Sequence, residues 1–222
     1  MWQKWYCDKI VAEGLEGRIC EMILLLLFLQ LLPNKEIFIY ETKDKDKIGR
    51  MDVISQKDSL GYHVVYTSDR TIEVILDTLN LGTLYINKIV DDELELKISR
   101  AKKFNVWFKG HERTYREDKP IYDRHTLDFA LRGFEYTPDF KTVIRLHVPE
   151  LMIINADIEV VGEEVVSTPL GEIPCWKVMM LPRVFFIRKK IFFWFEKDYP
   201  HRFIKLEDES GKKGIRLIGT EG

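Results

Sequence analysis

Residues 93–99 read Glu-Leu-Glu-Leu-Lys-Ile-Ser, and this short stretch decides the fold class. Apolar and polar side chains alternate along it, so one face of an extended strand points to a core and the other to water. We therefore expect strict alternation throughout this strand. One solvated face is typical of antiparallel sheets, whereas parallel sheets are covered on both faces.

The same alternation continues on both sides of this stretch. It occurs in residues 143–148 and in residues 154–160, where Asn155, Asp157 and Glu159 share one face. Such runs follow one another at intervals of about eight to twelve residues. This spacing favours a sandwich, a barrel or one large curled sheet over alternating β-α-β units. The chain from residue 35 to residue 222 is thus predicted to be a single, mainly β domain.

One stretch of this domain has helical character, namely residues 123–133. Leu127, Ala130 and Leu131 follow helical spacing, Asp123 can cap the start and Gly133 can end the segment. A single short helix between strands would plug or line whatever the sheet encloses. The predicted fold is therefore a large curled antiparallel sheet, or half-open β-barrel, that encloses one short helix.

The carboxy-terminal third contains a clear hairpin and an unusually apolar strand. Residues 162–178 read as two strands joined by a tight turn at Pro169-Leu170-Gly171. Residues 192–195 read Phe-Phe-Trp-Phe, which places bulky groups on both faces of one strand. Such a strand is either covered twice or lines a cavity on one side.

Residues 1–34 are predicted to be an amino-terminal extension with a signal-like apolar run at residues 23–32. The run is about half the roughly 20 residues needed to span a bilayer as a helix, but it suits the apolar region of a secretory signal. The residues before it are not a basic leader and no A-x-A cleavage site follows. We favour export to the periplasm or cell envelope, with Met22 as the physiological start. The alternative is a helix packed on the domain, and a retained extension would indicate the cytoplasm.

Composition excludes several classes of protein. The chain has 222 residues, of which 45% are hydrophobic, and a formal net charge of −2. This apolar content excludes intrinsic disorder, and the charge gives no reason to expect a nucleic-acid partner. Cys7, Cys20 and Cys175 lack the spacing of metal ligands, so we predict no metal and no cofactor. Cys175 is predicted to be buried and structural.

The sequence offers no catalytic constellation. It contains no G-x-S-x-G, H-E-x-x-H, Walker-type or G-x-G-x-x-G motif. We assign His147 to the solvated face of its strand beside Arg145, and His201 to a turn. No catalytic residue is predicted, and we expect the protein not to be an enzyme. The remaining alternative is a hydrolase whose site is assembled from distant residues, for which a histidine with acidic partners in a cleft would be the sign.

Residues 97–116 form a basic stretch with seven Lys and Arg side chains against one acidic residue, Glu112. Aromatic side chains are interleaved with them. This combination could serve as a platform for single-stranded nucleic acid or meet anionic lipid headgroups. A solvated outer face with aromatic side chains inside is the favoured interpretation, because alternating strands produce the same mixture.

Three segments of the chain resemble an uncharacterised bacterial envelope family that is thought to share the half-open β-barrel of the lipoprotein-localisation carriers. Together they span roughly residues 36–218. The matching residues are Asp123, Leu127, Leu131 and Arg132 on the helix, Glu164, Thr168, Pro169, Gly171, Cys175, Lys177 and Val178 around the hairpin turn, and Trp194, Phe195, Asp198, Arg202, Ile204 and Lys205 near the carboxyl end. The resemblance implies an exported protein whose large antiparallel sheet wraps around the helix, with no catalytic residues to carry over.

These observations predict a non-enzymatic envelope protein with an apolar cavity in its half-barrel. A lipid, a lipoprotein or another apolar ligand is the expected occupant, and an envelope protein is the other expected partner. The candidate ligand-binding residues are Trp107, Leu127, Phe129, Leu131, Phe193 and Trp194. The first alternative is a structural or protein-interaction module whose helix fills the sheet completely.

Overall fold

The structure is a computed structural model that describes residues 32–150, 152–184 and 189–221. Residues 33–222 form one compact unit built on fifteen strands. The first eight are β1 Lys35–Asp44, β2 Lys47–Lys57, β3 Tyr62–Thr67, β4 Arg70–Leu76, β5 Thr83–Val90, β6 Glu93–Arg100, β7 Phe104–Phe108 and β8 His111–Tyr115. The remaining seven are β9 Ile121–Asp123, β10 Lys141–His147, β11 Ile153–Thr168, β12 Gly171–Pro182, β13 Ile191–Glu196, β14 Phe203–Asp208 and β15 Lys213–Glu221.

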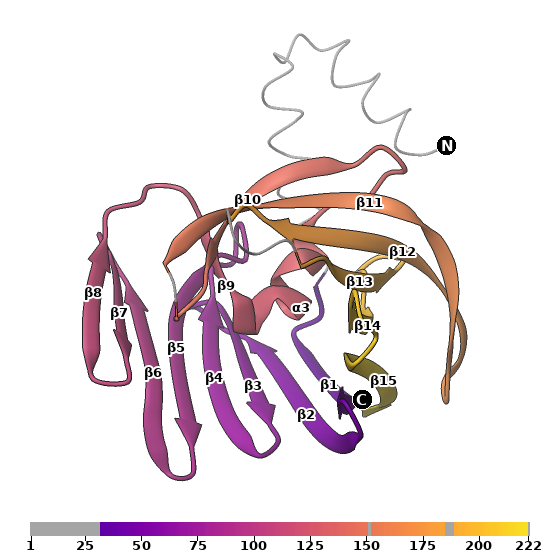
Figure 1. The fold of residues 1–222 in the computed structure, drawn as a ribbon, viewed down its shortest axis with the longest axis horizontal. Helices are drawn as coiled ribbons and strands as arrows, with labels where there is room; N and C mark the ends of the chain where they lie inside the picture. Colours follow the sequence, from indigo (N-terminus) through magenta and orange to yellow (C-terminus); the bar gives the residue numbers. More distant parts are fainter. Residues whose placement is uncertain (1–31, 151, 185–188, 222) are drawn as a thin grey trace, which may run out of the picture. The chain divides into compact units, whose positions relative to one another are not determined.

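All fifteen strands belong to one sheet, in the order β8-β7-β6-β5-β4-β3-β2-β1-β15-β14-β13-β12-β11-β10-β9. Consecutive strands from β1 to β8 are neighbours, and so are those from β9 to β15 (Figure 1). The two series meet where β1 pairs with β15 in antiparallel register. The predicted large antiparallel sheet is thus confirmed. One pair departs from it, because β9 lies parallel to β10.

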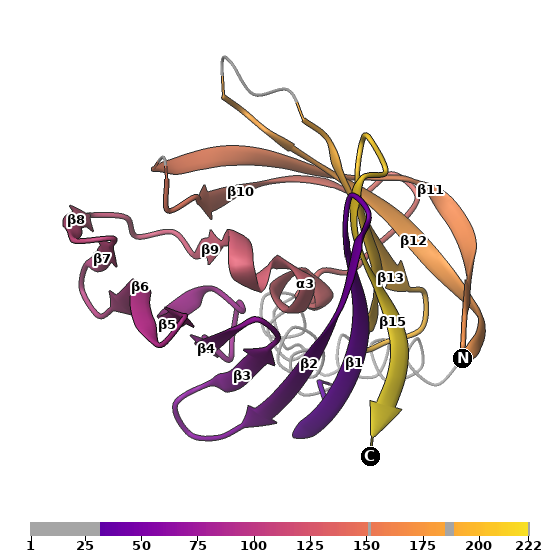
Figure 2. The same ribbon diagram turned by 60° about the horizontal axis from the view of Figure 1, so that its bottom comes forward.

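The sheet curls strongly but does not close, as Figure 2 shows from below. No ladder joins its two edge strands, β8 and β9, within the described residues. Side chains bridge the gap instead. The Thr83 hydroxyl accepts a hydrogen bond from the Asp123 main-chain N–H at 2.9 Å, and the rings of Phe104 and Tyr115 lie edge-on to His147. The unit is therefore a half-open barrel.

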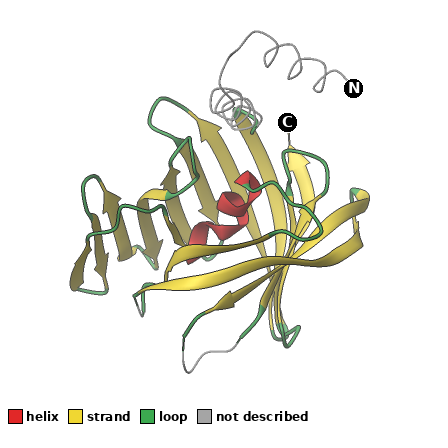
Figure 3. Cartoon of the chain, turned by 90° about the horizontal axis from the view of Figure 1, so that it is seen from above, coloured by secondary structure: helices red, strands yellow, loops and turns green. Residues whose placement is uncertain are grey.

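The predicted helical stretch is confirmed and lies in the hollow of the curled sheet (Figure 3). It consists of η1 Arg124–Thr126, α3 Leu127–Ala130 and η2 Leu131–Gly133. Asp123 caps its start, because its carboxylate accepts a hydrogen bond from the His125 main-chain N–H. Leu127, Phe129 and Leu131 are buried against the sheet.

The strict alternation expected for residues 93–99 is wrong at two neighbouring positions, Leu94 and Glu95. A β-bulge shifts the register between Lys88 and Ile89, so Glu95 turns inward and Leu94 remains 40% exposed. The Glu95 carboxylate pairs with the ammonium group of buried Lys88 at 2.5 Å and with that of exposed Lys109 at 3.1 Å. The hydrogen bond from Lys88 is the largest cause that lowers the pKa of Glu95 to about 2.

The predictions for residues 1–34 fall almost entirely outside the described residues. They concern the secretory signal, its cleavage and the boundary of the extension, and they stay predictions. Strand β1 begins at Lys35. Within the described residues, no helix has the length and apolar character needed to cross a membrane.

Candidate functional site

Arg132 ties the helical segment to the sheet. Its side chain is 1% exposed, and its guanidinium donates to both carboxylate oxygens of Glu36 on β1, at 2.8 and 3.0 Å. The guanidinium carbon also lies 5.5 Å from the ring centre of Phe38 and 5.0 Å from that of Phe129. A planar cation between two rings and a bidentate carboxylate is held in one geometry. Arg132 therefore fixes the helical segment against β1.

Asp128 is the second ionisable group of the helix that faces the interior. Its carboxylate accepts a hydrogen bond from the Tyr66 hydroxyl of β3 at 3.0 Å. Burial raises the pKa of Asp128 to about 6, and the hydrogen bond from Tyr66 opposes that rise. This carboxyl group consequently titrates much closer to neutral pH than an ordinary aspartate.

Asp123, at the end of β9, joins two histidines in a buried cluster. One carboxylate oxygen lies 2.7 Å from His125 Nδ1 and the other lies 2.6 Å from His147 Nδ1. Burial opposes ionisation of Asp123, but the hydrogen bonds with His125 and His147 outweigh it and hold the pKa of the carboxyl below its usual range. The acid therefore stays charged although its side chain is fully buried.

The assignment of His147 to a solvated face is wrong. His147 does share a face with Arg145, but its side chain is 1% exposed. Phe104 of β7 and Tyr115 of β8 cover it, with ring centres 5.3 and 6.3 Å away. These strands lie far from β10 in the sequence, so alternation within β10 gives no sign of the cover.

An acid paired with imidazole is a familiar part of hydrolase sites, but this cluster lacks an adjacent nucleophile. The hydroxyls beside it are bound to main-chain groups: Thr83 accepts from the Asp123 N–H, and Thr126 donates to the Asp123 carbonyl. Among the described residues, neither imidazole has a serine, threonine or cysteine side chain as a hydrogen-bond partner. The geometry fits a latch that fastens β9 to β10.

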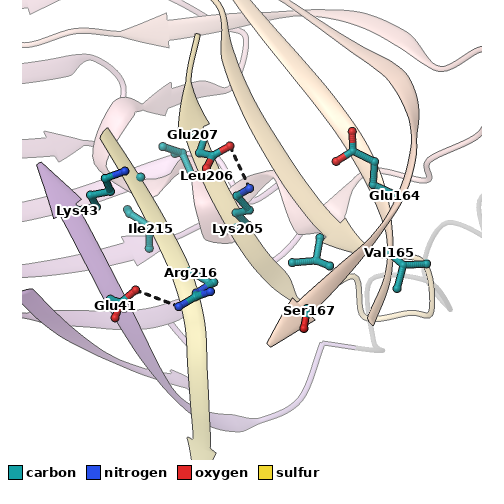
Figure 4. Close-up of a pocket in the computed structure, with 12 residues that line it drawn as sticks. Glu41, Lys43, Glu164, Val165, Ser167, Lys205, Leu206, Glu207, Ile215 and Arg216 are labelled. Carbon is teal, nitrogen blue, oxygen red and sulfur yellow. Dashed lines mark hydrogen bonds and ion pairs between the residues drawn. The ribbon is translucent and has the colours of Figure 1, made fainter. Parts of the chain in front are cut away.

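A groove of about 390 Å³ lies on the outer face of the sheet, away from the helix (Figure 4). Strands β1, β15 and β14 provide its floor, and β11 provides a wall. Charged side chains on the floor are paired across strands or along them, for example Arg216 with Glu41 at 3.2 Å and Lys205 with Glu207 at 3.0 Å. The lining residues are Glu41, Lys43, Glu164, Val165, Val166, Ser167, Lys205, Leu206, Glu207, Gly214, Ile215 and Arg216.

The β11 wall of the groove is a strand edge. Residues 164–167 of β11 line the groove, and the pairing of β11 with its two neighbours shows which of its edges is free. On one side β11 pairs with β12 as far as Thr168 and Gly171. On the other side pairing with β10 ends at Glu159, after which the Val160 N–H donates to the Phe140 carbonyl. From residue 161 to 168 this second edge has no strand partner within the described part of the chain.

The six candidate ligand-binding residues lie elsewhere. Leu127, Phe129 and Leu131 of the helix and Phe193 and Trp194 of β13 are buried, and Trp107 of β7 is half-buried. Trp194 comes nearest to the groove, since its indole N–H donates to Glu164 at 2.7 Å. None of the six lines the groove, and their proposed contact with a ligand stays a prediction.

Sequence reasoning missed the groove residues because they are brought together by the pairing register of neighbouring strands and not by a local motif. Glu41 of β1 faces Arg216 of β15, and Arg216 faces Lys205 of β14, so a strand from the start of the domain lies beside two from its end. Nothing in the sequence aligns these positions before the strand order is known. In the described part of the chain, no group of three or more His, Cys, Asp or Glu side chains could hold a metal ion.

Comparisons with known proteins bear on the fold more than on chemistry. A family model described as "Protein of unknown function (DUF3108)" matches residues 95–217. A solved structure from Brucella abortus, a beta-barrel-like protein of the domain of unknown function DUF1849, is similar with a TM-score of 0.54 at 14% identity, covering 86% of this chain and 98% of that chain. No curated protein matches the chain.

A second solved structure, from Parabacteroides distasonis, is a protein provisionally described as a lipoprotein. It has a TM-score of 0.35 at 10% identity and covers 85% of this chain and 96% of that chain, so the likeness is too slight to carry an argument. The comparisons confirm an uncharacterised family and a barrel-like β fold. The resemblance to lipoprotein-localisation carriers stays a prediction.

Proposed function

The chain belongs to the DUF3108 family of proteins of unknown function, and we propose that it is a non-enzymatic envelope protein that binds an extended polypeptide segment of a partner, such as a lipoprotein. The proposed site is the outer groove. The observation that carries this proposal is the free edge of β11 along the groove wall.

A free edge exposes main-chain N–H and C=O groups that an extended peptide can pair with, as an added strand. Val165 is 62% exposed on this edge, and Val161, at its start, is 44% exposed. Alternate side chains of an added strand would point to the groove floor, where Lys43, Lys205 and Arg216 lie among carboxylates. Main-chain hydrogen bonds to the β11 edge would supply affinity for the peptide, and the charged side chains of the floor would determine which peptide side chains fit.

The lining favours a peptide over an acyl chain. Half of the twelve lining residues are ionisable, whereas an acyl chain requires an apolar wall. The volume of about 390 Å³ falls within the range of roughly 300–1,000 Å³ typical of ligand sites. The interior expected to hold an apolar ligand contains the helix, whose Phe129 and Arg132 side chains are buried and in contact with each other.

The proposal that the protein is not an enzyme has to account for the Asp123 cluster. It is the arrangement named above as the sign of a hydrolase, but His147 is covered and the neighbouring hydroxyls serve the main chain. The envelope location rests on the apolar run at residues 23–32 and on the family resemblance of the sequence. The absence of enzymatic activity and the envelope location are therefore both parts of the proposal.

Site-specific photocrosslinking tests the proposal in cells that express the full chain. A photoreactive phenylalanine analogue replaces Val165 at the groove edge or, as the control, Val143 of β10, which is 47% exposed but does not line the groove. We expect a crosslink from position 165 to an extended segment of an envelope protein. A synthetic peptide of that segment should then slow amide hydrogen exchange at residues 161–168.

Three outcomes would overturn the proposal. They are equal crosslinking from both positions, adducts with phospholipid alone, and a peptide that leaves hydrogen exchange at residues 161–168 unchanged. The location is tested separately by amino-terminal sequencing after cell fractionation. An intact residue 1 in the cytoplasmic fraction would refute the envelope assignment.

A further inference from the structure

Part of the basic stretch gathers at one end of the half-barrel. Lys102 and Lys103 lie on the turn between β6 and β7 and are exposed, as are Arg116 and Lys119 on the segment that leads from β8 to β9. We call these four residues the basic rim. None of their side chains has a hydrogen-bond or ion-pair partner within the described residues.

The two halves of the rim are held side by side. The Arg100 guanidinium, just before the β6–β7 turn, donates to the carbonyls of Glu117 at 3.0 Å and Lys119 at 2.8 Å. Arg145 of β10 neutralises the Glu117 carboxylate at 2.8 Å. Among residues 116–119, Asp118 is then the one acidic side chain without an ion-pair partner. A concentrated positive charge therefore sits on a chain whose net charge is −2.

The exposed apolar side chain of Met152 lies on a turn near this charge, and buried Phe104 connects the two. Phe104 follows Lys103 directly and packs on His147, the last residue of β10. The β10–β11 turn begins there, with the Val148 N–H donating to the Met152 carbonyl, and Met152 is 56% exposed. The rim thus combines long cationic side chains with a thioether on an adjacent turn.

We propose that the basic rim docks the protein on a membrane surface that carries anionic phospholipid headgroups. Unpaired lysines are flexible point charges, which suit a diffuse layer of phosphates better than one fixed carboxylate. Met152 would enter the headgroup layer beside them. The opposite end of β7 and β8 is not suited to bind anionic headgroups. Its Lys109 is paired with Glu95, and the acidic turn Asp91-Asp92 lies beside it.

Co-sedimentation of the full chain with vesicles tests this proposal. We expect binding to vesicles of equal parts phosphatidylglycerol and phosphatidylcholine, and weaker binding at higher salt, since the attraction is screened within a Debye length. Each basic side chain near such a surface contributes roughly fivefold, so Lys102→Gln with Lys103→Gln should weaken binding about 30-fold. Met152→Ser should weaken it roughly threefold to tenfold.

The matched control is Lys45→Gln with Lys47→Gln, two exposed lysines at the β1–β2 turn, where Asp44 and Asp46 are their neighbours in the sequence. It removes the same charge, and all variants retain the apolar run of residues 23–32, so its contribution to binding cancels. Equal losses in both double variants would overturn the proposal, as would equal binding to pure phosphatidylcholine. Tighter binding to polyglutamate or to an RNA oligonucleotide than to the anionic vesicles would also overturn it. Unchanged circular dichroism establishes that the variants are folded.

Discussion

Glu36→Gln should destabilise the domain strongly, because it leaves the Arg132 guanidinium buried without its counter-charge. The side chain of Arg132 is 1% exposed and that of Glu36 is 10% exposed, and both carboxylate oxygens of Glu36 accept a hydrogen bond from Arg132. Breaking such a pair costs about 3–5 kcal/mol, far more than an exposed pair contributes. Arg132 keeps its contact with the Pro200 carbonyl and the two rings, so we expect the lower end, about 3 kcal/mol.

Thermal unfolding followed by circular dichroism measures this effect. A loss of about 3 kcal/mol corresponds to a decrease in Tm of roughly 6–12 °C for a domain of this size. The matched control is Glu41→Gln, whose partner Arg216 is 47% exposed, and it should cost at most about 1 kcal/mol. Adding Arg132→Met to Glu36→Gln should restore part of the loss, because no unpaired charge remains.

Two results would refute this reasoning. The first is a decrease in Tm no larger for Glu36→Gln than for Glu41→Gln, which would mean that the buried cation is satisfied without its carboxylate. The second is an additive loss in the Arg132→Met, Glu36→Gln double variant, which would mean that the two side chains do not act as a pair.

Three further predictions concern buried titratable groups. Because the pKa of Asp128 rises from 3.8 to about 6 on folding, the native state holds its proton more tightly, and this contribution to stability is lost as pH rises from about 4 to 6. Asp128→Asn, which keeps the acceptor for Tyr66, should therefore raise Tm at pH 7.5 and leave it unchanged at pH 4; an equal effect at both pH values would contradict this. His147→Phe should keep the ring packing but remove one hydrogen bond to the Asp123 carboxylate, which costs about 1.5–3 kcal/mol in chemical denaturation; an unchanged midpoint would show that the latch is not stabilising. Burial raises the pKa of Cys175 to about 12, so iodoacetamide at pH 8 should modify it only after denaturation, and a Cys175 adduct in the native state, detected by peptide mass spectrometry, would show that the thiol is accessible.

The parts of the fold that depend on neighbouring residues could be predicted from the sequence. Asp123 caps the helical segment and Gly133 ends it, as their positions around Leu127 and Leu131 indicate. The hairpin turn at residues 169–170 follows from proline and glycine. Phe193 and Trp194 occupy opposite faces of β13 and are both buried, so that strand is covered twice.

The features that sequence reasoning missed depend on contacts between distant strands. His147 looks solvated within β10, but Phe104 and Tyr115 arrive from β7 and β8 to cover it. The bulge at Glu95 is a second kind of miss, since it is a change of register between the neighbouring strands β5 and β6 that the alternation of β6 alone does not show. The groove likewise requires strands from both ends of the domain, which only the complete sheet brings together.

The pairing of β1 with β15 affects how this domain folds during its synthesis. β1 is the first strand of the domain to leave the ribosome and β15 is the last, and they are neighbours at the join of the two series. Until β15 arrives, β1 presents an open edge to any other extended chain. Completion of the sheet therefore waits until β15 has been made, and a product that stops before β15 retains an aggregation-prone edge on β1.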